Sequence, residues 1–251
     1  MKEHKSLWLV WQDAKTRLFY HVGTLSYFNN KYVFNYTFNS RGPQKVREAL
    51  DNGYMLHPSF PEVTKEYISD KLFAAFSRRL PSEIRVDFQH ILENLHLKEG
   101  FSPMDLLEQT RGKLTNDQYS FEKPLRIENE KLVTSFFVNG MHYQKDLPEN
   151  WPEIIRSFNC VELKPEPENL VDKNAIAVYT ALNIKLGYIP RFYAQGISAL
   201  IENGAKPSIK VNYINENSSS DWWVKLDFES DVPRLDKHQL KNLDLIFENV
   251  V

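Results

Sequence analysis

The residues best suited to ligand chemistry lie in one polar stretch, residues 166–178, Glu-Pro-Glu-Asn-Leu-Val-Asp-Lys-Asn-Ala-Ile-Ala-Val. This stretch is turn-forming as far as Asn174 and then alternates as a strand does. Residues 187–191, Gly-Tyr-Ile-Pro-Arg, predict a strand end, a proline and a helix start. A cation at a helix start is electrostatically unfavourable, so Arg191 favours an anion-binding role. Tight turns that enter strands commonly present contact residues, and the pattern therefore favours binding over catalysis.

Residue patterns typical of catalysis are missing from the sequence. The seven histidines are scattered without metal-ligand spacing, and there is no Gly-x-Ser-x-Gly turn or nucleophilic cysteine environment. Gly140 and Gly187 stand alone, so no phosphate-binding loop is expected. Four carboxylates around the turn raise the alternative of a nuclease or metal site, but a solvated acidic loop is the preferred interpretation: Glu162, Glu166, Glu168 and Asp172. We expect a protein that is not an enzyme and has no cofactor or metal.

Composition limits the class of protein further. A chain of 251 residues suggests one or two domains, and 42% hydrophobic with 25% charged residues is ordinary for a globular protein. The net charge of −2 argues against a generic nucleic-acid coat, which is normally strongly basic. The single Cys160 excludes an internal disulfide framework and a cysteine-rich zinc site. The first apolar run is too short for a signal peptide and no stretch reaches the length of a membrane span, so we expect a cytoplasmic location and no membrane partner.

The elements that must position these residues form two groups. Residues 1–127 predict an antiparallel sheet with helices: strands 6–11, 17–25 and 31–36 form a meander, and a last strand lies near 117–121 with another near 125–126. Helices are predicted over 43–50, 72–80 and 84–95, and from Ser102 and Pro103 onward, where Ser102 suits an N-cap. The predicted fold class is α+β.

The helical segments carry a first resemblance. Residues 72–82, Leu-Phe-Ala-Ala-Phe-Ser-Arg-Arg-Leu-Pro-Ser, and residues 103–108, Pro-Met-Asp-Leu-Leu-Glu, resemble the N-terminal subdomain of HipA-type toxin kinases. The resemblance covers most of residues 5–125, and the signatures of the kinase body are absent from the chain. It implies a bacterial protein-interaction module whose partner is a separately encoded HipA-type kinase or another protein.

The second group covers residues 132–230, after a short charged connection. Strands are predicted at 132–139, 159–163, 175–179, 184–188, 208–214 and 222–228, with helices at 148–158 and 192–203. Short strands rich in aromatic residues favour a small closed or partly closed barrel. Residues 231–251 predict a helical tail, with Leu240, Leu243, Ile246 and Phe247 at helical spacing.

Three motifs of this group occur in the order found in one family. Residues 140–143 (Gly-Met-His-Tyr), 166–178 and 187–191 together resemble a HIRAN domain. The resemblance implies an OB-like β-barrel that binds single-stranded DNA and captures its 3′-hydroxyl end.

The resemblance also implies roles for five residues and a departure at a sixth. Tyr143 stacks on a terminal base, and Trp222 supplies a second stacking face. Asp172 accepts a hydrogen bond from the 3′-hydroxyl, while Tyr188 and Arg191 contact terminal phosphates. His142 stands where the DNA-binding domain of this family has an arginine. Alternatives remain for several of them. Asp172 and Asn174 either bind a ligand or close an Asx-type turn, and Tyr188 is either a contact residue or a core aromatic.

Charge decides how strong such binding can be. Residues 132–230 carry nine Lys and Arg against twelve Asp and Glu, a net charge of −3. Because phosphate neutralisation dominates nucleic-acid affinity, we expect weak, end-directed, salt-sensitive binding to single-stranded DNA. The alternative function is a protein-interaction or antitoxin-like regulator of a separately encoded HipA-type kinase that binds no DNA.

Overall fold

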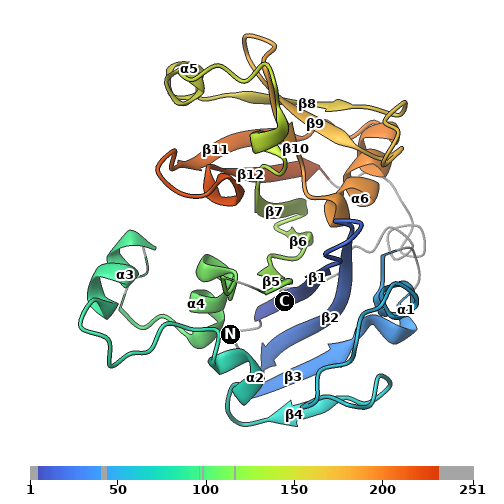
Figure 1. Ribbon diagram of the computed structural model, residues 1–251, viewed down its shortest axis with the longest axis vertical. Helices are drawn as coiled ribbons and strands as arrows, with labels where there is room; N and C mark the ends of the chain where they lie inside the picture. The colour runs from blue at the N-terminus through green and yellow to red at the C-terminus, as the bar shows by residue number, and fades with distance from the viewer. Residues whose placement is uncertain (1–4, 41–43, 96, 98, 116, 232–251) are drawn as a thin grey trace. The chain divides into compact units, whose positions relative to one another are not determined.

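The computed structural model describes residues 5–40, 44–95, 97, 99–115 and 117–231, and the chain divides into two compact units, Met1–Pro124 and Leu125–Val251 (Figure 1). Each unit mixes helices with antiparallel sheets. Most of the predicted helical tail, residues 232–251, lies outside the described residues.

The first unit contains a five-stranded antiparallel sheet in the order β4-β3-β2-β1-β5. Its strands are β1 (Lys5–Gln12), β2 (Phe19–Phe28), β3 (Lys31–Tyr36), β4 (Tyr67–Ser69) and β5 (Tyr119–Glu122). Alternate residues of the three long strands face one apolar core, among them Leu7, Leu9, Tyr20, Val22 and Phe34. The predicted meander is confirmed, whereas the short edge strand β4 was not predicted.

The helices of this unit are η1 (Thr37–Asn39), α1 (Val46–Asp51), α2 (Ala74–Ser77), α3 (Phe88–Asn94) and α4 (Pro103–Thr110). The predicted N-cap is confirmed: the Ser102 hydroxyl accepts a hydrogen bond from the Asp105 amide, and the Asp105 carboxylate accepts one from the Ser102 amide. The helices predicted over 72–80 and 84–95 are too long. Pro81 disfavours helix before it, and Ile84 and Val86 are exposed outside α3 rather than packed in a core.

The second unit contains two antiparallel sheets, one in the order β10-β9-β8 and one in the order β11-β12-β7-β6. The first has β8 (Val161–Pro165), β9 (Ile176–Thr180) and β10 (Lys185–Tyr188), and the second has β6 (Arg126–Glu128), β7 (Lys131–Phe137), β11 (Ser208–Ile214) and β12 (Val224–Asp231). The strand predicted near 125–126 therefore pairs with β7, in the second unit.

Single bridges join these two sheets. Asn139 pairs with Tyr188, and Cys160 pairs with Lys210. At the first bridge, the Asn139 amide donates to the Tyr188 carbonyl at 2.8 Å and the Tyr188 amide donates to the Asn139 carbonyl at 2.9 Å. These bridges link the sheets without merging them into one continuous ladder among the described residues.

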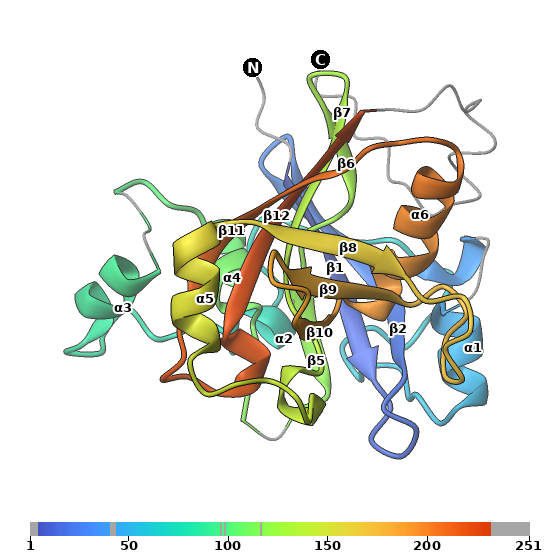
Figure 2. The ribbon, with the colours of Figure 1, turned by 90° about the horizontal axis from the view of Figure 1, so that it is seen from above.

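The described residues of this unit also form two helices and two short 3-10 turns. They are η2 (Met141–Tyr143), α5 (Trp151–Phe158), α6 (Arg191–Glu202) and η3 (Ser220–Trp222). Figures 1 and 2 show α5 and α6 on opposite sides of the unit. Tyr193, Ile197 and Leu200 lie on the buried face of α6, and Gly204 follows its end at a φ of +87°, a conformation that glycine commonly adopts after a helix.

Candidate functional site

The polar stretch of residues 166–175 forms a closed loop between β8 and β9. The Glu166 amide donates to the Ala175 carbonyl at 2.8 Å, and the Ala175 amide donates to the Asp172 carbonyl at 2.9 Å. Within the loop, the Asn169 amide donates to the Glu166 carbonyl at 3.0 Å. Because β8 and β9 are antiparallel neighbours, this loop is anchored at both ends by the sheet.

Asn169 shapes the loop and reaches out of it. Its Oδ1 accepts hydrogen bonds from the amides of Val171 (3.0 Å) and Asp172 (3.2 Å), as asparagine does in an Asx turn. Its Nδ2 lies 3.3 Å from Glu166 Oε2 and 3.2 Å from Tyr188 Oη. One amide side chain thus connects the backbone of the loop to the tyrosine of β10.

Asp172 closes the turn with one oxygen and faces Arg191 with the other. Oδ1 accepts a hydrogen bond from the Asn174 amide at 2.9 Å, and Oδ2 lies 3.2 Å from Arg191 Nε. The Asp172 side chain is 12% exposed and that of Arg191 is 26% exposed. The carboxylate offsets the unfavourable position of a cation in the first turn of α6. The turn-closing interpretation of Asp172 therefore describes one of its oxygens and leaves the second for ionic contact.

The guanidinium of Arg191 is incompletely satisfied. Its Nε and Nη1 are buried and, within the described part of the chain, neither makes a hydrogen bond, although Nε is within ion-pair distance of Asp172. A buried donor without an acceptor is costly, by about 1–3 kcal/mol, and such groups commonly mark a functional position.

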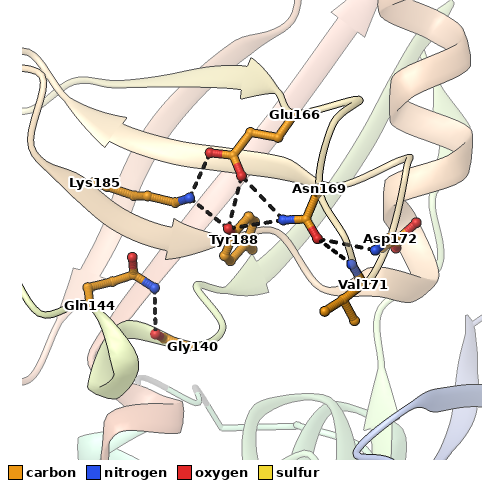
Figure 3. Close-up of polar contacts among 8 residues, drawn as sticks. All are labelled: Gly140, Gln144, Glu166, Asn169, Val171, Asp172, Lys185 and Tyr188. Carbon is orange, nitrogen blue, oxygen red and sulfur yellow. Dashed lines mark hydrogen bonds and ion pairs between the residues drawn. The ribbon is translucent and has the colours of Figure 1, made fainter.

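Tyr188 is held through its hydroxyl in a four-residue network (Figure 3). The hydroxyl donates to Glu166 Oε2 at 2.9 Å, and Lys185 Nζ lies 2.6 Å from both Glu166 Oε1 and the Tyr188 hydroxyl. The Lys185 ammonium also lies 4.2 Å from the centre of the Tyr188 ring, within cation–π range. Tyr188 is half-buried and bonded at its polar end, so it is neither a plain core aromatic nor a free side chain.

The network changes the acidity of both its charged groups. Burial raises the pKa of Glu166, but the hydrogen bonds from Lys185, Tyr188 and Asn169 together outweigh it, and the pKa of Glu166 is lowered. Burial likewise lowers the pKa of Lys185, and the bonds to Glu166 and Tyr188 reverse the direction, so that the pKa of Lys185 is raised. Both groups are held in their charged forms at neutral pH.

Gly187 is the residue that allows Tyr188 to take this position. A Cβ at residue 187 would lie 2.4 Å from the Asn139 carbonyl oxygen and 3.1 Å from Val138 Cγ1, and φ is +154°. Only glycine lets β10 approach the end of β7 this closely. The register of β10 against β9 also shifts between Lys185 and Gly187, which is a bulge-like irregularity.

The predicted stacking residues lie in the two 3-10 turns. His142 and Tyr143 belong to η2, and their rings meet edge-on at 5.5 Å between centroids. Tyr143 is 75% exposed. Trp222 belongs to η3 and packs edge-on against Phe137, with 5.0 Å between centroids.

The turns η2 and η3 are neighbours, and η2 also lies beside β10. Placing Trp222 on a strand was wrong, because η3 ends there and β12 begins at Val224. Trp222 and Trp223 are both half-buried.

The structure therefore brings four predicted residues into two pairs. Asp172 contacts Arg191 directly, and the turn that carries Tyr143 lies beside the turn that carries Trp222. Sequence reasoning missed the part that Lys185 plays and did not foresee the bond of Asn169 to Tyr188. Strict strand alternation would place residues 185 and 188 on opposite faces, and the irregularity in β10 accounts for their meeting.

Comparison with known proteins identifies part of this unit. The model of the HIRAN domain family matches residues 131–229. The prediction of a HIRAN domain is confirmed for these residues. The match does not extend to the N-terminal half, whose resemblance to the HipA subdomain remains a prediction.

Two solved structures are also similar, at low identity. The HIRAN domain of human HLTF is 19% identical with a TM-score of 0.32, over 41% of this chain and 81% of that one. A protein from Lactobacillus plantarum is 22% identical with a TM-score of 0.32, over 41% of this chain and 99% of that one. The comparison with curated proteins found no match.

A metal centre is the other kind of site that clustered carboxylates could form. Within the described residues of the whole chain, no group of three or more His, Cys, Asp or Glu side chains is arranged to hold a metal ion. No described helix combines the length and the apolar character needed to cross a bilayer.

Proposed function

We propose that the HIRAN domain of this protein binds single-stranded DNA and captures its 3′-hydroxyl end, without catalysing a reaction. The N-terminal unit acts as a protein-interaction module. In this proposal the two bridged sheets serve as a partly closed, OB-like barrel, and the loop of residues 166–175 together with η2 and η3 forms the binding face.

The observation that carries the proposal is the Asp172–Arg191 pair. A 3′-terminal nucleotide offers a hydroxyl that donates a hydrogen bond, with a phosphate oxygen nearby that accepts one. The pair offers the complement: a carboxylate oxygen 3.2 Å from Arg191 Nε, and an arginine side chain that is 26% exposed. A carboxylate oxygen can accept more than one hydrogen bond, so Asp172 can bind the hydroxyl while keeping its turn and its arginine.

The remaining predicted residues supply the contacts to the base. Tyr143 is exposed and free to stack on it, and Trp222 lies on the neighbouring turn. Stacking on aromatic rings accepts any base, at about 1–3 kcal/mol per base. His142 would add a charge only when protonated, in contrast to the permanent charge of an arginine.

The test is fluorescence anisotropy at low salt with oligonucleotides that end in a 3′-hydroxyl or a 3′-phosphate. The hydroxyl end should bind more tightly, because a 3′-phosphate removes the donor and brings charge against the Asp172 carboxylate. Asp172→Asn should reduce this preference, since its amide can still accept from the Asn174 amide but lacks the charge. Equal binding of the two ends, or none, would remove the end-recognition proposal.

A second candidate function is a regulator that binds only protein, such as a separately encoded HipA-type kinase. The net charge of −3 over residues 132–230 favours it, because repulsion opposes any polyanion. A stable kinase partner recovered with the purified protein, together with the absence of oligonucleotide binding, would support this candidate over the first.

A further inference from the structure

The cations of the candidate site are already neutralised from within the site. Lys185 is paired with Glu166 at 2.6 Å, and Arg191 is paired with Asp172 at 3.2 Å. Both carboxylates belong to the loop of residues 166–175.

The third cation near the loop is exposed. Lys173 has no ion pair within the described residues, and the loop also carries the exposed Glu168. The loop together with Lys185 and Arg191 thus contains three carboxylates and three cations, and its formal charge is zero. A site built mainly to follow a phosphate backbone would be strongly positive.

Resting on the function proposed above, we propose that Glu166 limits how many phosphates this site contacts, so that the site reads the end of a strand and not its length. Glu166 masks the ammonium of Lys185, which lies beside the ring of Tyr188. Among the cation of the loop and the two cations paired with it, the charges left to meet phosphate are those of Arg191, whose side chain is 26% exposed, and of the exposed Lys173. The site therefore neutralises at most two phosphates.

This limit has a measurable consequence in salt. For single strands the logarithm of affinity falls with the logarithm of salt concentration by about 0.7 per phosphate neutralised. Between about 50 and 200 mM salt, two phosphates weaken binding about sevenfold, three weaken it about 18-fold, and six weaken it several hundredfold. The affinity of the wild-type protein should fall by no more than about sevenfold over this range of salt concentration.

The decisive variant is Glu166→Gln. It frees one positive charge while keeping a side chain that can bond to Tyr188 and Asn169. We expect it to bind a 3′-hydroxyl oligonucleotide about threefold more tightly at low salt, as a unit charge about 7 Å from a phosphate in water would do. The loss of affinity of this variant between about 50 and 200 mM salt should rise to about 18-fold. If Glu166 only supports the structure, the variant should bind more weakly than the wild type, because a loosened Tyr188 weakens binding. Its salt dependence should then stay unchanged.

A matched control is Glu162→Gln on the adjoining strand β8. Glu162 is exposed and lies 3.8 Å from Lys164, so this variant makes the same change in net charge away from Tyr188. It should leave both the affinity and the salt dependence close to those of the wild type. An equal gain in the two variants would show a general charge effect and overturn the role of Glu166.

The experiment is anisotropy titration of the full chain with one 3′-hydroxyl oligonucleotide at several salt concentrations, with thermal unfolding of each variant as a check on folding. A preference for the 3′-hydroxyl end combined with a steep wild-type salt dependence overturns this inference and leaves the proposed function standing. Weaker binding by Glu166→Gln also overturns it. No binding by the wild type at any salt concentration overturns the proposed function and this inference together.

Discussion

The bridge between β7 and β10 depends on the missing side chain of Gly187, and Gly187→Ala is the sharpest test of the fold around the site. The added Cβ would meet the Asn139 carbonyl oxygen at 2.4 Å, so the two strands must separate by about 1 Å to reach ordinary contact. That movement breaks the two backbone hydrogen bonds between Asn139 and Tyr188, which are 2.8 and 2.9 Å long.

The cost can be estimated from these terms. Each lost hydrogen bond contributes about 1 kcal/mol to stability, and the backbone strain of an alanine at this φ adds about 1 kcal/mol or more. Gly187→Ala should therefore lower the free energy of unfolding by about 3 kcal/mol. With a urea dependence of about 1.5 kcal/mol per molar, the unfolding midpoint of this unit falls by about 2 M.

Gly204→Ala provides a matched control in the same unit. Gly204 also has a positive φ, +87°, but no atom lies within 4 Å of the position of its Cβ. Gly204→Ala should therefore lower the free energy of unfolding only by the conformational penalty of about 1 kcal/mol. The assay is urea unfolding, with hydrogen exchange of the Asn139 and Tyr188 amides to locate the change. If the free energies of unfolding of the two variants differ by less than about 0.5 kcal/mol, the steric reasoning about Gly187 is refuted.

Two further predictions concern the first unit. Burial, followed by the charge of Lys45, holds the pKa of His21 well below its usual value, so the unfolded chain binds more protons and stability falls as the pH drops below about 6.5. His21→Gln should flatten this decline in thermal melts recorded across pH 5–8, and an unchanged profile would contradict it. Arg111→Ala leaves the buried carboxylate of Glu122 with the Ser120 hydroxyl but without its cation at 2.5 Å, and should lower the free energy of unfolding in urea by about 3–5 kcal/mol. Arg85→Ala breaks an exposed pair and should cost less than about 1 kcal/mol; equal losses for the two arginines would refute the argument from burial.

Local pattern was enough to place most of the strands. The alternation of residues 31–36 and 208–214 corresponds to β3 and β11, and Ser102 followed by Pro103 marks the start of α4. These signals are local because a strand period or a helix cap is a property of a few neighbouring residues. The apolar spacing of residues 72–95 was misleading, because some of these residues pack against the aromatic core from outside any helix, as Phe73 does against Phe60.

The site was only partly predictable. The type and spacing of residues 140–143, 166–178 and 187–191 are enough to indicate a HIRAN domain, and the family match at residues 131–229 confirms it. The sequence also contains every charge of the site, so the neutrality of the site follows from residue types alone. It does not show which carboxylate meets which cation.

The tertiary structure decided those pairings. Asp172 meets Arg191 because the end of β10 returns beside the loop that leaves β8. Lys185 joins Tyr188 and Glu166 across an irregularity in β10 that simple alternation cannot predict. The physical reason is the same in both cases: residue type and local spacing are written along the chain, whereas partners far apart in sequence are chosen by strand register and by the close approach that Gly187 permits.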